Sequence, residues 1–276
     1  MKEHISTMER KIAFFDIDGT LTSELDGSVL PSTKNAIKKA RDNGHIMFIN
    51  TGRCMQNVEK RFLEIGFDGI ISGCGTNIYC NENGINKELL YVSQTHAVTS
   101  EILTHARKFK LDLLFEGKNY VRFDTKSPLL TEGGIRQYNA FLSRNYDMSQ
   151  NPEEEYFTCD KFVIWFTDME DLPAFRRVSD KYFECIDRGG NFREFVPIGY
   201  SKATGIQFVL DHYQIAHENS YSFGDSNNDL PMLNYTNYSV AMGNAVPASL
   251  FDQVTYVSAK SSENGIRQAL EHYGFI

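Results

Sequence analysis

Short apolar runs alternate with helix-like stretches in two separate parts of this sequence. Near the start, residues 12–15, 46–49 and 69–72 are predicted strands, and apolar residues recur at helical spacing between them. This alternation indicates βα units, in which crossover helices join parallel strands. The pattern is interrupted in the middle of the chain and then returns. We therefore predict an α/β, Rossmann-like core domain with a parallel sheet, built from residues 1–76 and 199–276.

The middle of the chain follows a different pattern. Apolar runs on either side of the turn-forming residues 81–84 predict a hairpin, and a second hairpin is expected near residues 184–196. We therefore expect residues 77–198 to form an inserted α+β domain, and a chain of 276 residues is long enough for two cores. Residues 1–7 precede the first strand, and we expect the fold not to need them.

Charge and cysteine content narrow the classes of partner. The formal net charge is −8 and the sequence has no cluster of Lys and Arg, so we expect no nucleic-acid partner. The five cysteines are scattered without a Cys-x-x-Cys pair, which is typical of proteins in the reducing cytoplasm. We find neither a signal peptide nor an apolar run of the roughly 18 residues that span a membrane. The sequence therefore predicts a cytoplasmic protein without membrane contact and leaves its oligomeric state open.

Polar residues follow the predicted strands of the α/β domain at the points where those strands end. Asp16 and Asp18 follow the first strand, and Thr51 and Gly52 follow the second. Open α/β sheets bind their ligands at this edge. Grouped carboxylates repel one another and lose hydration, so they need a cation or a proton as a partner. Asp16 does not start a calcium loop of the helix–loop–helix type, because Leu21 stands where that loop needs glycine.

Two further polar sites lie after the interruption. Lys202 opens the helix that follows the inserted domain, and the stretch 224–229, Gly-Asp-Ser-Asn-Asn-Asp, follows the predicted strand 220–223. The order and content of the four sites resemble the haloacid dehalogenase superfamily, specifically its Cof-type phosphatases with a class IIB cap. The likeness covers essentially the whole chain. It includes residues 241–245, which are similar to the stretch that this family carries after its acidic loop.

The resemblance implies a role for each matching residue. A carboxylate can attack phosphorus and form an aspartyl-phosphate, and Asp16 is the candidate nucleophile. In the family, the residue at the position of Asp18 protonates the leaving group and then deprotonates water. The implied cofactor is Mg²⁺, which prefers oxygen ligands. The candidate site residues are Asp16 and Asp18 for catalysis, Thr51, Gly52, Lys202 and Asn228 for phosphate binding, and Asp16, Asp18, Asp225 and Asp229 for the metal.

The resemblance also predicts the function. We expect a Mg²⁺-dependent phosphatase that hydrolyses a small phosphorylated metabolite, such as a sugar phosphate or a phosphorylated cofactor, through an aspartyl-phosphate. Two alternatives stay open: a phosphomutase acting on hexose phosphates, and a non-catalytic protein that binds a phosphometabolite. The inserted domain would contact the rest of the substrate. We expect Trp165 in the core because its strand is apolar, whereas Arg53 either pairs with a neighbouring loop or contacts substrate.

Overall fold

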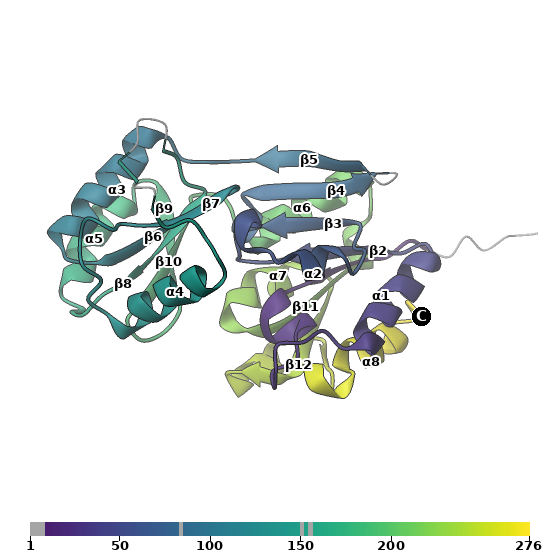
Figure 1. The fold of residues 1–276 in the computed structure, drawn as a ribbon. Coiled ribbons are helices and arrows are strands. Elements are labelled where there is room, and N and C mark those ends of the chain that lie inside the picture. Colours follow the sequence, from purple (N-terminus) through teal and green to yellow (C-terminus); the bar gives the residue numbers. More distant parts are fainter. Residues whose placement is uncertain (1–8, 83–84, 150–151, 154–156) are drawn as a thin grey trace, which may run out of the picture.

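The computed structural model describes residues 9–82, 85–149, 152–153 and 157–276. Two β-sheets, each with its own helices, form two parts that lie side by side (Figure 1). The predicted extension 1–7 and the middle of the predicted turn, residues 83–84, lie outside the described residues.

The larger sheet combines strands from both ends of the chain. Within the described residues it has eight strands in the order β13-β12-β11-β1-β2-β3-β4-β5. All neighbours from β13 to β3 pair in parallel, which confirms the predicted Rossmann-like core. The strands are β1 (Ile12–Phe15), β2 (Ile46–Asn50), β3 (Gly69–Ser72), β4 (Asn77–Glu82), β5 (Ile85–Tyr91), β11 (Ser220–Ser226), β12 (Tyr238–Val246) and β13 (Tyr256–Val257).

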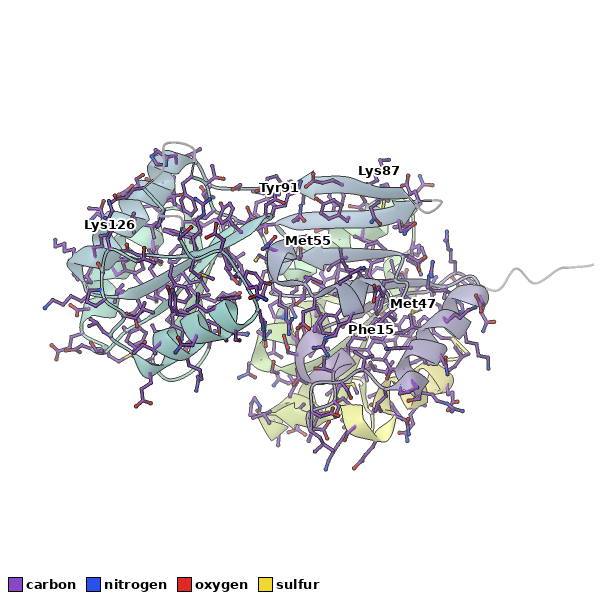
Figure 2. All side chains as sticks on the ribbon, in the orientation of Figure 1. Phe15, Met47, Met55, Lys87, Tyr91 and Lys126 are labelled. Atoms are coloured by element: carbon purple, nitrogen blue, oxygen red, sulfur yellow. The ribbon has the colours of Figure 1, made fainter. Side chains whose placement is uncertain are left out.

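The hairpin of β4 and β5 joins the larger sheet, whereas we expected it to begin the inserted domain. Residues 73–75 make a tight turn, so β4 returns directly beside β3 and pairs antiparallel with it. β5 then forms the edge of the sheet, where Figure 2 labels Lys87 and Tyr91. Turn residues predict a hairpin but not the sheet that it joins. The domain limits of 77–198 stay predictions, and this pairing favours a first limit after Tyr91.

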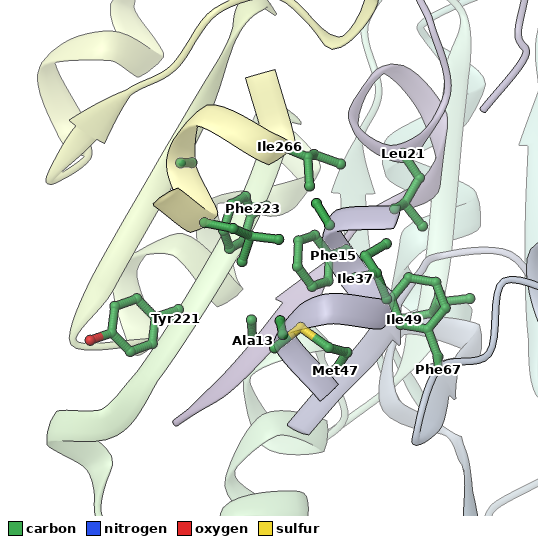
Figure 3. Close-up of a cluster of buried hydrophobic side chains, with 14 of the residues drawn as sticks. Ala13, Phe15, Leu21, Ile37, Met47, Ile49, Phe67, Tyr221, Phe223 and Ile266 are labelled. Carbon is green, nitrogen blue, oxygen red and sulfur yellow. The ribbon is translucent and has the colours of Figure 1, made fainter. Parts of the chain in front are cut away.

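Two layers of helices bury the central strand of the larger sheet. Ala13 and Phe15 of β1 lie on one face, in the apolar cluster of Figure 3. Ile12 and Phe14 alternate with them and lie on the other face. Burial on both faces explains why this strand is apolar throughout. The helices of the first face are α1 (Pro31–Asp42), α2 (Lys60–Leu63) and α8 (Gly265–His272), and those of the second are α6 (Lys202–Tyr213) and α7 (Leu230–Tyr235).

The smaller sheet and its helices form a second part, which we call the cap. Its described strands are all antiparallel, in the order β7-β6-β8-β10-β9. Helices α3 and α5 cover one face, and α4 covers part of the other. No helix in the described part of the chain is long and apolar enough to cross a membrane. The elements are β6 (Asp112–Gly117), β7 (Tyr120–Phe123), β8 (Lys161–Trp165), β9 (Phe183–Asp187), β10 (Phe192–Pro197), α3 (His96–Lys108), α4 (Glu132–Ser143) and α5 (Asp171–Ser179).

The loop after β2 connects the larger sheet with the cap. Cys54 in this loop is buried within an apolar cluster that also contains Phe141 of α4. The hydroxyl group of Tyr146 donates a hydrogen bond to the backbone oxygen of Gln56 at 2.9 Å. The cap is therefore docked on the loop that begins with Thr51.

Candidate active site

Asp16 is the first residue beyond β1, at the carboxyl edge of the larger sheet. Its backbone N–H donates to the carbonyl oxygen of Phe223 at 3.0 Å, which ties it to β11. The chain turns after Asp16, and Gly19 takes a left-handed φ of +74°. A Cβ atom on Gly19 would lie 2.0 Å from Oδ2 of Asp225. Glycine at this position therefore lets the turn approach the Asp225 carboxylate.

Lys202 comes to the same edge from the other side of the inserted segment. Helix α6 begins at Lys202, and the preceding Ser201 caps it by accepting the backbone N–H of Thr204 at 3.2 Å. The Nζ atom of Lys202 lies 2.5 Å from Oδ1 of Asp16 and 2.6 Å from Oδ1 of Asp229. All three side chains are buried. One ammonium group thus bridges two carboxylates that burial would otherwise disfavour in their charged form.

Asp229 organises the loop that carries Asp225. Its Oδ1 atom contacts Lys202, and its Oδ2 atom accepts the backbone N–H groups of Asp225 and Ser226 at 2.9 and 3.2 Å. Both oxygens of Asp229 therefore have partners within the protein. In contrast, Oδ1 of Asp225 is buried and has no hydrogen-bond partner among the described residues.

The three carboxylates form a site that fits a hard divalent cation. Oxygen atoms of Asp16, Asp225 and Asp229 lie within 4.8 Å of one another. Burial, together with the neighbouring negative charges of Asp16 and Asp229, raises the pKa of Asp225 to about 8. Burial also raises the pKa of Asp16 to about 7, although Lys202 opposes this shift. An oxygen-only donor set with surplus negative charge and one unpaired oxygen matches the preferences of Mg²⁺.

We expect Mg²⁺ to stabilise the protein more at about pH 8 than at about pH 5. The pKa values of Asp16 and Asp225 are raised from 3.8 to about 7 and 8, so without metal the folded state retains protons that the unfolded chain releases. The contribution of the two protonated carboxyl groups to the free energy of unfolding is fully present below pH 3.8. It is lost as the pH rises through the folded-state pKa values of about 7 and 8. Once Asp16 and Asp225 have lost their protons, bound Mg²⁺ would offset the repulsion between the two charged carboxylates. Thermal denaturation with Mg²⁺ and with a chelator across this range measures the effect, and an increment in melting temperature that shrinks with pH would contradict it.

Asp18 is held by Arg53. The Nε and Nη2 atoms of Arg53 donate to the two carboxylate oxygens of Asp18 at 2.9 and 2.6 Å. The same guanidinium donates to Oε1 of Glu59 at 3.2 Å and lies 5.4 Å from the ring centre of Phe62. Such a two-point contact defines direction as well as distance. Of the two roles expected for Arg53, the structure shows the first, a pair with a neighbouring loop.

A cavity of about 420 Å³ lies between these residues and the cap. The structure brings all residues of the predicted site to this region. Asp16, Asp18 and Asp225 line the cavity together with the predicted phosphate ligands Thr51, Gly52 and Asn228. Lys202 and Asp229 lie buried beside it, joined to Asp16 and to the Asp225 loop.

The cap closes the cavity with charged side chains, of which sequence reasoning missed Glu116, Lys161 and Glu194. The Nζ atom of Lys161 on β8 lies 2.6 Å from Oε2 of Glu116 on β6 and 2.5 Å from Oε1 of Glu194 on β10. All three are buried, and Nε of Arg188 lies 3.5 Å from Oε2 of Glu194. Lys161 directly precedes the apolar residues of β8, and this was the available signal, because a buried charge requires a partner.

Trp165 lies in the core of the cap, as we expected. Its side chain is buried and stacks on Phe123 and on Phe192, with ring centres 6.0 and 5.0 Å away. Trp165 and Phe192 also line the cavity, next to the charged cluster. The cap therefore presents both an aromatic wall and buried charges to a ligand.

The sequence matches the family of haloacid dehalogenase-like hydrolases over residues 13–270. It is 25% identical to the 5-amino-6-(5-phospho-D-ribitylamino)uracil phosphatase YitU of Bacillus subtilis over 266 residues, 94% of this chain and 95% of that protein. The fold is similar to BT1666, a phosphatase of the HAD superfamily from Bacteroides thetaiotaomicron, with a TM-score of 0.82, 24% identity, and coverage of 99% and 98%. It is also similar to the subclass IIB sugar phosphatase BT4131, with a TM-score of 0.78, 23% identity, and coverage of 96% and 100%.

Proposed function

The chain belongs to the haloacid dehalogenase-like hydrolases and is a phosphatase for phosphorylated small molecules, and we propose that it works with Mg²⁺ and through an aspartyl-phosphate on Asp16. One observation carries this proposal. The carboxylate of Asp16 is oriented by Lys202 at one side of a cavity, beside the unpaired oxygen of Asp225. A nucleophile, a fixed positive charge and a candidate metal ligand thus meet where a phosphoryl group can enter.

In the first step, a carboxylate oxygen of Asp16 attacks the phosphorus atom. The bond between phosphorus and Asp16 forms while the bond to the leaving oxygen breaks, and Asp18 gives that oxygen a proton. The ammonium group of Lys202 keeps Asp16 oriented and offsets negative charge near the phosphoryl oxygens. The hydroxyl group of Thr51 and the backbone N–H of Gly52 are proposed donors to those oxygens, and Asn228 is a further proposed contact.

In the second step, water hydrolyses the aspartyl-phosphate. Asp18 takes a proton from the water molecule, whose oxygen attacks phosphorus, and the bond to Asp16 breaks. Inorganic phosphate leaves and both carboxyl groups return to their starting states. Asp18 therefore acts once as an acid and once as a base, which requires a side chain that stays at the edge of the cavity.

Asp16 and Asp225 are the proposed direct ligands of Mg²⁺, with the backbone carbonyl of Asp18 as a further one. We propose that Asp229 contributes through water, because both of its carboxylate oxygens already have protein partners. When bound, Mg²⁺ supplies positive charge that offsets repulsion between the phosphoryl group and these carboxylates.

Release of inorganic phosphate tests the proposed function. The substrates are p-nitrophenyl phosphate and a panel of phosphorylated sugars and cofactors, each assayed with Mg²⁺ and with a chelator. We expect turnover that depends on the metal. Isomerisation of a hexose phosphate without net phosphate release would instead identify a phosphomutase, and binding without turnover would identify a non-catalytic protein.

Replacing Arg53 with glutamine is expected to lower turnover of alkyl phosphates by about 10- to 100-fold, part of the effect of a positioned acid/base. Without Arg53 the Asp18 carboxylate loses both donors that orient it. An alkoxide needs protonation as it leaves, whereas p-nitrophenolate needs little, so the loss should be smaller for p-nitrophenyl phosphate. Steady-state kinetics with both substrates measures the difference.

Arg61→Gln is the matched control for the Arg53 variant. Arg61 also donates to Glu59 and lies 4.6 Å from the ring centre of Phe62, but its other hydrogen bond goes to the backbone of Gly27. We expect it to change turnover little. A positioning role for Arg53 would be contradicted if Arg53→Gln lost as much turnover on p-nitrophenyl phosphate as on alkyl phosphates. It would also be contradicted if Arg61→Gln lost as much turnover as Arg53→Gln.

We further propose that the charged cluster of the cap binds the leaving group. Glu116, Lys161, Glu194 and Arg188 belong to the cap and line the same cavity as Asp16 and Asp18. Their formal charges cancel, and they offer both donors and acceptors, which suits a leaving group rich in hydroxyl or amine groups better than a second phosphate. A sugar phosphate or a phosphorylated cofactor meets this description.

Replacing Glu116 with glutamine is expected to raise KM for the preferred substrate by about 10-fold or more, because a hydrogen bond to a charged acceptor is lost. The value of kcat should change less, since Glu116 lies on the cap and not beside Asp16. Glu88→Gln is the control, because Glu88 pairs with Lys118 and does not line this cavity. An unchanged KM in the Glu116 variant would mean that Glu116 does not bind the substrate.

We propose a cytoplasmic location. All five cysteines of the chain are free thiols in the structure, and four of them are buried. This state fits a reducing compartment.

A further inference from the structure

A thiol, a carboxylate and an imidazole converge at the end of the larger sheet that lies away from the phosphatase site. Cys80 and Glu82 belong to β4, and His212 belongs to the last turn of α6. We propose that these three side chains form a second metal site, which binds a transition-metal ion of the zinc class. This proposal is independent of the proposed phosphatase mechanism.

The distances between the three donor atoms suit a tetrahedral ion. Oε1 of Glu82 lies 3.5 Å from Sγ of Cys80 and 3.3 Å from Nε2 of His212. All three donor atoms lie within 4.8 Å of one another. Zinc binds sulfur at about 2.3 Å and nitrogen or oxygen at about 2.0–2.2 Å, so two ligands of one tetrahedron stand roughly 3.3–3.8 Å apart. Small side-chain adjustments would therefore bring all three atoms around one ion.

The local structure explains why these side chains meet. Cys80 and Glu82 are two residues apart on one strand, so both point to the same face of the sheet. Helix α6 packs on that face, where Ile206, Val209 and Leu210 share an apolar cluster with Cys80. His212 lies in the last turn of the same helix, two residues after Leu210.

Solvent can reach the side chains of Glu82 and His212, and one carboxylate oxygen of Glu82 faces both other donors. Cys80 is buried, whereas Glu82 and His212 are partly exposed, so an ion can arrive from solvent. Lys87 on β5 pairs with Oε2 of Glu82 at 3.5 Å, which leaves Oε1 facing the thiol and the imidazole. The oxygen Oε1 is thus the common neighbour of both other donors.

The chemistry of this donor set differs from that of the aspartate cluster. Sulfur and imidazole nitrogen favour zinc or cobalt, whereas the oxygen-only set of Asp16, Asp225 and Asp229 favours Mg²⁺. On binding, the Cys80 thiol loses its proton to solvent and the imidazole of His212 stays neutral. A thiolate and a carboxylate then balance the two positive charges of the ion, and water takes the fourth position.

The site would tie the edge hairpin to the helix that begins at Lys202. β4 starts beside the end of β3 at the phosphatase edge and runs away from it, so Glu82 lies at its far end. His212 follows Lys202 by about 15 Å along α6, at roughly 1.5 Å per residue. A bound ion would therefore clamp the far end of α6 to the hairpin without contacting substrate.

Cobalt absorption tests this proposal on the full chain. The protein is kept reduced and in excess Mg²⁺, so that the aspartate cluster is occupied, and Co²⁺ is titrated as the probe. We expect a thiolate-to-cobalt charge-transfer band in the near ultraviolet that saturates at one ion per chain. Cys80→Ser should abolish the band, and His212→Ala should weaken binding by about tenfold or more.

Cys185→Ser is the control, because Cys185 is a partly exposed thiol on β9, far from this face. Its cobalt band should equal that of the unaltered protein. Zn²⁺ should also raise the melting temperature of the unaltered protein more than that of His212→Ala, which changes a partly exposed side chain and is expected to fold. The absence of a band, or a band that persists in Cys80→Ser, would overturn the proposal, whatever the outcome of the phosphatase assay.

Discussion

Phosphate release by the Asp16→Asn variant is expected to be lower by about 10³-fold or more, because an amide cannot form the aspartyl-phosphate. The substitution keeps the shape of the side chain and removes the carboxylate that lies 2.5 Å from Lys202. It also removes one of three clustered negative charges, so the folded state should be at least as stable as before. Steady-state turnover of p-nitrophenyl phosphate in saturating Mg²⁺ measures the loss.

Asp42→Asn provides the comparison for this variant. Asp42 is exposed at the end of α1 and pairs with Lys38, and we expect its replacement to leave turnover unchanged. Circular dichroism shows whether both variants are folded. Turnover in Asp16→Asn that equals turnover in Asp42→Asn would mean that Asp16 is not the nucleophile.

Replacing Lys202 with methionine is expected to lower the free energy of unfolding by about 3–5 kcal/mol when a chelator is present at about pH 8. Methionine keeps much of the side-chain volume. It leaves Asp16 and Asp229, both buried, without the ammonium group that bridges them. Mg²⁺ can replace part of this charge, so the loss should shrink when the metal is added. Urea denaturation under both conditions gives the two values.

Lys38→Met separates this effect from the general loss of a lysine. Lys38 is exposed and forms an i,i+4 pair with Asp42, which is worth about 0.3–0.5 kcal/mol. If Lys202→Met costs no more than this control, the buried bridge does not stabilise the fold. Phosphate release by Lys202→Met should also fall, since Asp16 loses the contact that orients it.

Local patterns were sufficient to predict the apolar core around β1 and the grouping of Asp16 with Asp225 at one edge of the larger sheet. Strand β1 is apolar at every position because both of its faces are covered, and its aspartates follow immediately. The carboxyl ends of parallel strands share one edge, so the order of motifs along the chain is enough to place Asp16 and Asp225 together. The sheet to which β4 and β5 belong could not be predicted, because turn residues report local pairing alone.

The cap side of the cavity depends on contacts that a single sequence does not encode locally. Glu116 lies opposite Lys161 across β6 and β8, and this register decides which charges meet. Glu194 joins them from β10, which pairs with β8 from much further along the chain. The pair of Asp18 and Arg53 likewise depends on how two loops approach each other.

The burial of Cys54 against the cap means that the loop after β2 holds the cap closed over the cavity. Moving the cap away would expose Cys54 and Phe141 to water and break the hydrogen bond from Tyr146 to Gln56. Exposing apolar surface costs about 25 cal/mol per Å², so the burial of Cys54 and Phe141 favours the closed state. Residues 51–53 precede Cys54 in the same loop, but backbone hydrogen bonds tie them to the larger sheet: the N–H of Thr51 donates to Ile71, and the N–H of Gly73 donates to Arg53. Opening would therefore uncover the proposed phosphate donors and leave them in place, so the phosphate-binding side would stay assembled while product leaves.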